Sequence, residues 1–244
     1  MPPASPVRRA LRALGPLAVA PAALAALLAA PAIGRAQVAT IDEGSFTVSR
    51  GGTRLGREEF RIVRQPAGGG SAFMARSTGQ FGDRRVAPVL QTDVDGAPER
   101  YQVEVRRNGA VEQRVSAQVA GSHFRAQSVS DGGEAAREFL IDRGTLVVDD
   151  EVFHQYYFAV RRAQSGSGAA SMLTPRRGVQ SAVTIALDAP ERVTVGGQSL
   201  AARRFVVTDA AGGRREVWAD DAGRVLRVRL PADGVEALRD DPPR

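Results

Sequence analysis

The chain has 244 residues, no cysteine, and 33 basic residues against 27 acidic ones, and every one of the bases is arginine. Four of the arginines and none of the acids lie in residues 1–36, so the rest of the chain carries 29 bases against 27 acids, a net charge of only +2. This composition excludes a disulfide framework, thiolate chemistry and lysine-based phosphate or Schiff-base sites. The interspersed charges also argue against a nucleic-acid-binding patch.

Residues 1–36 are typical of an export signal. Three arginines lie within the first 12 residues, and an Ala/Leu-rich apolar run follows as far as residue 33. The sequence "GRAQ" then places the small residue Ala36 directly before an expected cleavage site at Gln37. Prolines interrupt the apolar run, and alanine drives membrane insertion only weakly, which favours a cleaved signal over a membrane anchor. We therefore expect a periplasmic or secreted protein, exported by the Sec or the twin-arginine route, whose residues 37–244 form a single antiparallel β domain.

Short strands separated by turn signals are expected from residue 44 to about residue 148. Asn108-Gly109 is the strongest two-residue hairpin signal in the chain, and Pro88 indicates an edge strand or a bulge. On either side of that hairpin, apolar and polar residues alternate as in a half-buried antiparallel pair, with Gln113 as the one polar residue on the inward face. The expected inward apolar residues are Tyr101, Val103, Val105, Val111, Val115, Ala117 and Val119.

The stretch "DDEVFHQYYFAVRRA" (149–163) changes this period. Asp149 or Asp150 can cap a helix, and arginines in the last turn suit the helix dipole, so we expect one helix near 150–162. Its apolar stripe would hold Val152, Phe153, Tyr156, Tyr157 and Val160 at helical spacing. His154 is expected on the helix surface, away from that stripe.

The last third of the chain returns to strands. A Gly/Ser/Ala-rich linker (164–171) precedes them, and a polar tail with about one helical turn follows them. In the last expected strand, Leu226, Val228 and Leu230 share one face. The expected strands are 179–187, 191–195, 198–209, 214–220 and 224–230.

The predicted fold is mainly β: a curved antiparallel sheet, half-barrel or barrel-like, closed by the one helix. A single curved sheet cannot bury its concave face alone, so the aromatic stripe is interpreted first as a core plug. The alternative is that the plug leaves a groove for a lipid or another apolar ligand. The ligand-binding candidates are then Phe153, Tyr156, Tyr157, Val103, Val105, Val115 and Trp218, with Val119 beside them.

No motif in the sequence predicts catalysis, a cofactor or a metal site. Asp93, Asp95 and Glu99 lack the spacing of a calcium loop and are better explained by a turn. The two histidines, His123 and His154, have no metal-binding spacing. A Ser–His–acid site assembled across the fold around either of them stays open.

The segment 195–231 ends in a W-x-D-x-x-G-x-x-L-R-like pattern, carried by Trp218, Asp220, Gly223, Leu226 and Arg227. This ending resembles that of uncharacterised periplasmic β-sheet proteins. The whole layout resembles the lipoprotein-carrier-like superfamily of LolA/LolB-type half-barrels, although the carriers have several helices where one is expected here. The resemblance implies an exported curved sheet covering an apolar cavity and transfers no catalytic residue.

Three functions follow from these observations. The first is a non-enzymatic cell-envelope protein that binds an apolar or amphipathic ligand, a lipid or lipoprotein. The second is a structural or assembly protein with a packed interior, which binds another envelope protein through its sheet edges. The third is a hydrolase with a dispersed triad around His123 or His154.

Overall fold

The computed structural model describes residues 38–67, 70–166 and 168–244. The predicted signal peptide (1–36) and its cleavage site lie outside these residues. Within the described part, no helix is long and apolar enough to cross a membrane.

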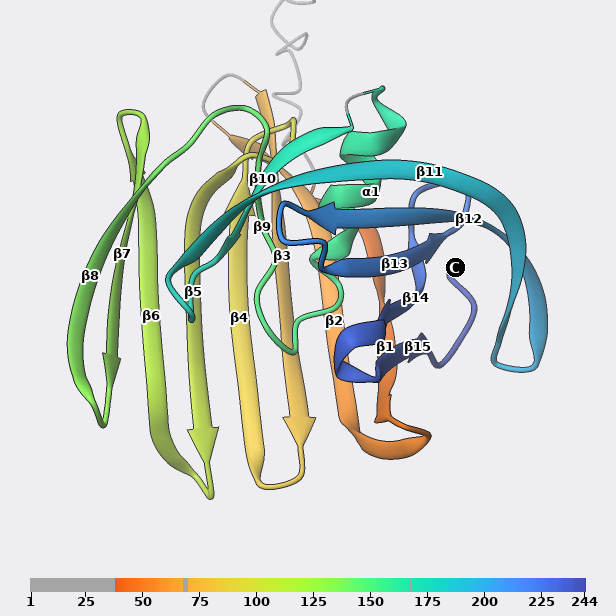
Figure 1. The fold of residues 1–244 in the computed structure, drawn as a ribbon, viewed down its shortest axis with the longest axis horizontal. Coiled ribbons are helices and arrows are strands. Elements are labelled where there is room, and N and C mark those ends of the chain that lie inside the picture. The colour runs from red at the N-terminus through yellow and green to blue at the C-terminus, as the bar shows by residue number, and fades with distance from the viewer. Residues whose placement is uncertain (1–37, 68–69, 167) are drawn as a thin grey trace, which may run out of the picture. The chain divides into compact units, whose positions relative to one another are not determined.

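One large sheet accounts for most of the described chain, as predicted (Figure 1). Its first half is a meander in which each strand pairs antiparallel with the next. The strands of this half are β1 (Ala39–Arg50), β2 (Thr53–Ala67), β3 (Gly70–Phe81), β4 (Arg84–Thr92), β5 (Pro98–Arg107), β6 (Ala110–Ala120), β7 (His123–Ser130) and β8 (Gly133–Leu140).

The second half of the sheet is attached through β15, which pairs antiparallel with β1. The sheet order is therefore β8 through β1 and then β15 down to β9. Among the strands of the described ranges, β9 and β10 pair in parallel and all other neighbours pair antiparallel. The strands of this half are β9 (Thr145–Val147), β10 (Ala169–Thr174), β11 (Val179–Val195), β12 (Gln198–Asp209), β13 (Arg214–Ala219), β14 (Val225–Leu230) and β15 (Val235–Arg239).

Local turn chemistry explains the β5–β6 hairpin. Asn108 and Gly109 have φ of 49° and 82°, the positive values that a tight primed turn needs, and Arg107 pairs with Ala110 across it. Pro88, in contrast, lies on a central strand and not at an edge, and it pairs with Val103 of β5. The β3–β4 ladder skips Pro88, which fits the missing N–H donor of proline.

The expected polar tail contains an additional strand. The 3₁₀ helix η1 (Pro231–Asp233) supplies the predicted helical turn, and β15 then completes the seam between the two halves of the sheet. The expected linker is also partly strand, because β10 begins at Ala169. In the "VEALR" sequence of β15 every second residue is buried, but the run is too short and too charged to be recognised as a strand from composition.

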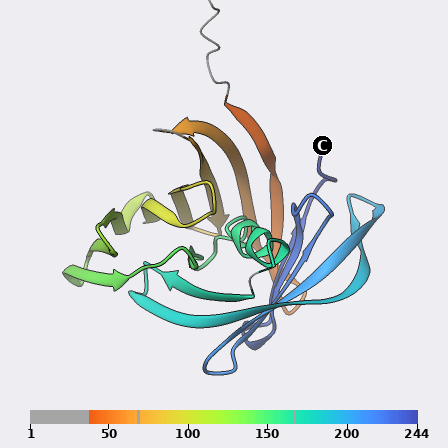
Figure 2. The ribbon, with the colours of Figure 1, turned by 90° about the horizontal axis from the view of Figure 1, so that it is seen from above.

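The single α-helix of the described chain, α1 (Tyr156–Gln164), lies inside the curve of the sheet (Figures 1 and 2). It contacts β11, β13 and β14. Its residues Tyr156 to Val160 are all buried, so the helix is hidden on every side over that turn and does not expose a polar face. The curved sheet around one central helix agrees with the predicted fold class.

Candidate functional site

The segment that precedes α1 is held by side chains and is not helical. The carboxylate of Asp149 accepts a hydrogen bond from the Tyr101 hydroxyl (2.7 Å) and lies 3.3 Å from Arg176 Nε. The Asp149 backbone N–H donates to the Gln155 side chain (2.8 Å). The predicted aspartate cap is wrong, because this carboxylate is committed to these partners, and the helix begins only at Tyr156.

His154 lies in that same segment, and its predicted position on the helix surface is wrong. It is 1% exposed, and its Nδ1 lies 2.7 Å from Glu58 Oε1 of β2. Glu58 Oε2 accepts the backbone N–H groups of Phe153 (2.8 Å) and His154 (3.3 Å), and the Phe60 ring stacks on the imidazole. Glu58 therefore ties the chain leading into the helix to the sheet.

The predicted ligand contacts of the aromatic stripe are deeply buried. Phe153, Tyr156 and Tyr157 are each 3–4% exposed and belong to the main core. Tyr157 packs edge-on against Phe73 and Phe158 at centroid distances of 6.2 and 5.3 Å.

The strand residues predicted to face them behave in two ways. Val103, Val105 and Val115 are at most 2% exposed and join the same core. Val119 lies near the end of β6 and is 37% exposed, as is Val111, whose pairing is shifted by an irregularity opposite Arg106. These two residues therefore do not fill the interior.

Trp218 is buried but belongs to a second cluster, separate from the aromatic stripe. It packs with Leu226, Val193, Val195 and Ala202 and donates from Nε1 to Glu191 (2.7 Å). The β13–β14 ladder shifts register here, so that Leu226 packs with Trp218 while Val228 faces the main core. The prediction that Leu226 and Val228 share a face is wrong, because the shift rotates the strand by one residue.

A pocket of about 770 Å³ opens where several hairpins end. It is bounded by the β1–β2 hairpin, the β3–β4 turn, the segment before α1, and the chain between β14 and β15. We call it the hairpin pocket. Its lining residues are Val48, Arg50, Arg54, Leu55, Phe81, Gly82, Arg84, Gln113, Asp150, Glu151, Phe153, Arg176, Arg177, Leu230, Asp233 and Val235.

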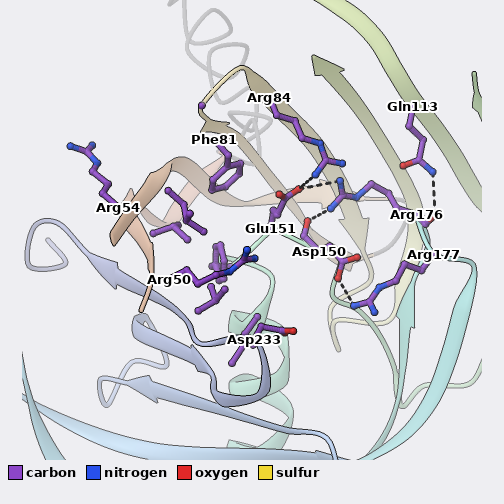
Figure 3. Close-up of a pocket in the computed structure, with 16 residues that line it drawn as sticks. Arg50, Arg54, Phe81, Arg84, Gln113, Asp150, Glu151, Arg176, Arg177 and Asp233 are labelled. Atoms are coloured by element: carbon purple, nitrogen blue, oxygen red, sulfur yellow. Dashed lines mark hydrogen bonds and ion pairs between the residues drawn. The ribbon is translucent and has the colours of Figure 1, made fainter. Parts of the chain in front are cut away.

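The lining divides into an apolar part and a charged part (Figure 3). Six of the residues are large and apolar, and among them is Phe153, which the sequence also singled out. The charged part holds five arginines against three acids. Both the size and the mixture of an apolar wall with a few convergent polar groups are typical of ligand sites.

Ion pairs organise the inner side of the charged part. Glu151 Oε2 lies 2.6 Å from Arg84 Nη1 and 3.5 Å from Arg176 Nη1. Arg84 also lies 3.2 Å from Glu112, and Arg177 pairs with Asp150. Segments that are distant in the sequence are thereby held together around the pocket.

Behind the pocket, buried groups fix the position of Arg176. Burial raises the pKa of Asp149 although Arg176 and Tyr101 oppose the rise, and burial together with the Asp149 carboxylate raises the pKa of Tyr101 well above 10.0. Burial alone would lower the pKa of Arg176, but Asp149 raises it. Arg176 is therefore a permanent cation, and the Gln113 side chain donates to its backbone carbonyl (3.1 Å).

Arg50 and Arg54 come from the β1–β2 hairpin on the other side of the pocket. In the described chain, neither has an acidic partner within 4.0 Å. Figure 3 shows the Arg50 guanidinium directed toward the middle of the pocket and that of Arg54 directed away from the other lining residues. The lining thus keeps a net positive charge, because its five arginines outnumber its three acids.

Neither histidine forms a Ser–His–acid arrangement in the described residues. His154 pairs with Glu58, but its Nε2 has no hydrogen-bond partner there. His123 lies at the start of β7, and in the described residues its ring has one side-chain hydrogen-bond partner, its neighbour Ser122 (3.4 Å). Over the same ranges, no three His, Cys, Asp or Glu side chains gather as a metal site, and Asp93 instead accepts the backbone N–H groups of Asp95 and Ala97 in a turn.

Of the residues that line the hairpin pocket, Gln113 and Phe153 stood out in the sequence, but the five arginines did not. They occur beside turn glycines, in "SRGGTR" (49–54), "FGDRR" (81–85) and "TPRRG" (174–178). Paired arginines at three turn signals could have suggested a basic rim at one end of the sheet.

Residues 95–238 match the family described as Domain of unknown function (DUF6134), which is more than half of the chain. The chain belongs to this family. No curated protein matches the sequence. The result supports an uncharacterised β-sheet family and makes no assignment to the lipoprotein carriers.

Two solved structures match the DUF6134 protein, and the first of them resembles it in fold. One is a beta-barrel-like protein of the DUF1849 family from Brucella abortus, with a TM-score of 0.52, 10% identity, and coverage of 84% of this chain and 98% of that one. The other is a DUF1089 family protein from Pseudomonas aeruginosa, with a TM-score of 0.39, 10% identity, and coverage of 69% and 87%. The first supports a beta-barrel-like fold and carries no information on activity.

Proposed function

We propose that this DUF6134 protein is a non-enzymatic binding protein of the cell envelope, which holds an amphipathic molecule in the hairpin pocket. The observation that carries the proposal is the pocket of about 770 Å³, with its apolar wall beside five arginines. An acyl or other apolar chain would lie against Phe81, Phe153 and Leu230, and a polar group would face the arginines. Burial of apolar surface would supply most of the affinity.

This proposal moves the ligand away from the position that the sequence suggested. Tyr156, Tyr157 and the inward valines are packed against one another in the core, and an acyl chain could enter among them only by displacing them. Of the predicted contacts, Phe153 alone reaches the hairpin pocket. The aromatic stripe therefore serves the proposed function indirectly, by holding the pocket wall in place.

An exported location fits the proposal. The predicted signal peptide would deliver the domain to the periplasm or outside the cell, where lipids and lipoproteins are available as ligands. The resemblance of the layout to the lipoprotein carriers points to the same class of ligand.

The first test is native mass spectrometry of the protein expressed as its whole chain and purified from the producing cell envelope. We expect a bound mass of lipid size that organic extraction removes. Leu55→Trp should reduce this occupancy because it fills the pocket, whereas the matched change Leu187→Trp, at a residue 57% exposed on β11, should not. A ligand-free mass that takes up neither fatty acid nor phospholipid would contradict the proposal.

A second candidate is the structural or assembly protein that binds through a sheet edge. Strand β8 pairs only with β7, and Phe139 is its one buried residue. Such an edge can accept a strand from another envelope protein. A ligand-free domain that co-purifies with a partner would favour this candidate.

A further inference from the structure

We propose that the ligand of the hairpin pocket carries an oxyanion, a carboxylate or a phosphate, which binds Arg84, Arg176 and Arg50 in the place that Glu151 occupies. The inference rests on the proposed function and deepens it. In the ligand-free protein, Glu151 would act as an internal substitute for the anionic group of the ligand.

Glu151 occupies the position that such a group would need. Its carboxylate lies between two guanidinium groups, 2.6 Å from Arg84 Nη1 and 3.5 Å from Arg176 Nη1. Guanidinium groups bind carboxylates and phosphates in the same planar geometry. A side chain already held there shows that an oxyanion fits between these arginines.

The backbone of Glu151 is strained. Its φ is +61°, a value that is unfavourable for residues other than glycine and that is concentrated at ligand clamps and switches. The residue lies between β9 and α1, outside any regular element. A change in its backbone conformation would therefore release strain without breaking a strand or a helix.

The arginines would keep their positions without Glu151. The Arg176 side chain is 4% exposed and is also held by Asp149 (3.3 Å) and by the backbone carbonyl of Asp150. Arg84 keeps its ion pair with Glu112 (3.2 Å). The subsite is thus formed before the ligand arrives, which lowers the entropic cost of binding.

The uncompensated charge around the pocket favours an anion over a cation. The lining holds five arginines against three acids, a net charge of +2. Asp150 and Glu151 are engaged by arginines, while Asp233 and Arg50 have no ion pair in the part of the chain that the structure describes, and Arg50 is directed toward the middle of the pocket (Figure 3). An incoming oxyanion would gain Arg50 as a third cation. The apolar wall next to these arginines would take the chain of the same molecule.

The test is isothermal titration calorimetry with decanoate, decyl phosphate and decanol below their aggregation limits, which share one chain and differ in the head group. We expect either anion to bind at least about fivefold more tightly than decanol, from roughly 1 kcal/mol of partly screened charge interaction. The tighter of the two anions identifies carboxylate or phosphate as the preferred group. Equal binding of all three compounds would overturn the oxyanion subsite and leave the proposed function intact, and binding of none would overturn both.

Variants test the competition itself. Glu151→Gln should strengthen binding of the anions by about three- to tenfold and leave decanol unchanged, because it removes a competing charge while keeping the shape. Glu138→Gln, which removes an exposed carboxylate paired with Arg125 on the outer strands, is the matched control and should change neither. Unchanged or weaker anion binding by Glu151→Gln would overturn the role of Glu151.

Discussion

The buried ion pair between Asp42 and Arg239 joins β1 to β15, the two strands at which the halves of the sheet meet. Arg239 Nη2 and Nη1 lie 2.8 and 3.0 Å from the two carboxylate oxygens, and the two side chains are 1% and 3% exposed. Arg239 also donates to the Glu43 carbonyl (2.6 Å), and its guanidinium lies over the Phe60 ring at 5.3 Å. The seam also holds Asp240, which accepts hydrogen bonds from Ser45 and Thr47, but its side chain is 21% exposed, so the Asp42–Arg239 pair is the better place to test burial.

Asp42→Asn should lower the free energy of unfolding by about 3–5 kcal/mol, because it leaves the Arg239 cation buried without its counter-charge. Arg239→Met should lower the free energy of unfolding by a similar amount, because it leaves the Asp42 carboxylate buried without its cation. The double variant Asp42→Leu/Arg239→Met should cost clearly less than the sum, because it leaves no unpaired charge in the core.

Urea denaturation with linear extrapolation measures these differences. The control is the Arg125–Glu138 pair, which has the same N–O distance of 2.8 Å but side chains 58% and 54% exposed. Glu138→Gln should cost less than about 1 kcal/mol, because water screens the exposed pair. Two results would refute this reasoning. One is that Asp42→Asn lowers the free energy of unfolding no more than Glu138→Gln does. The other is that the loss in the double variant equals the sum of the losses in the two single variants.

Two further predictions concern the core and the pH dependence of the seam. Tyr157→Ala should cost about 3–5 kcal/mol, because a 4% exposed aromatic packed against Phe158 would leave a cavity; Tyr157→Phe is the milder control, and an unchanged urea midpoint would contradict the core role. Partial burial by itself would raise the pKa of Asp240. The hydrogen bonds from Thr47 and Ser45 and the nearby Arg57 outweigh this effect, so that the pKa lies below its ordinary value of 3.8. Asp240 therefore stabilises the fold above about pH 4, and this contribution is lost as the pH falls through its folded-state pKa. Asp240→Asn should lower the melting temperature at about pH 6 but not at about pH 2, and an equal shift at both would refute the charge-based reasoning.

The mainly β architecture and its hairpins could be read from the sequence, because they depend on local rules. The Asn108-Gly109 turn needs only backbone conformations that these two residues favour, and alternation along β5 and β6 predicts which valines face inward until the strand ends, as Val119 shows. The concentration of aromatics in residues 153–158 likewise predicted a central packing element. These features require no knowledge of what lies across the sheet.

The position of the helix start and the environment of the histidine were decided by partners far away in the sequence. Glu58 is 96 residues from His154, and Tyr101 is 48 residues from Asp149. Each aspartate or histidine has the same local propensity whether or not such a partner arrives. Tertiary hydrogen bonds therefore overrode the capping signal, and no periodicity within 149–163 could have shown it.

The candidate site is likewise a product of tertiary structure. Its arginines lie on three separate turns, and the sheet brings them together only because β15 joins β1 and thereby connects the two halves. The sequence determined a curved sheet around an aromatic plug, since apolar patterning and turn residues act locally. Register and strand order decided where charge would gather and where a pocket would remain open, because these depend on pairings between residues up to 197 positions apart.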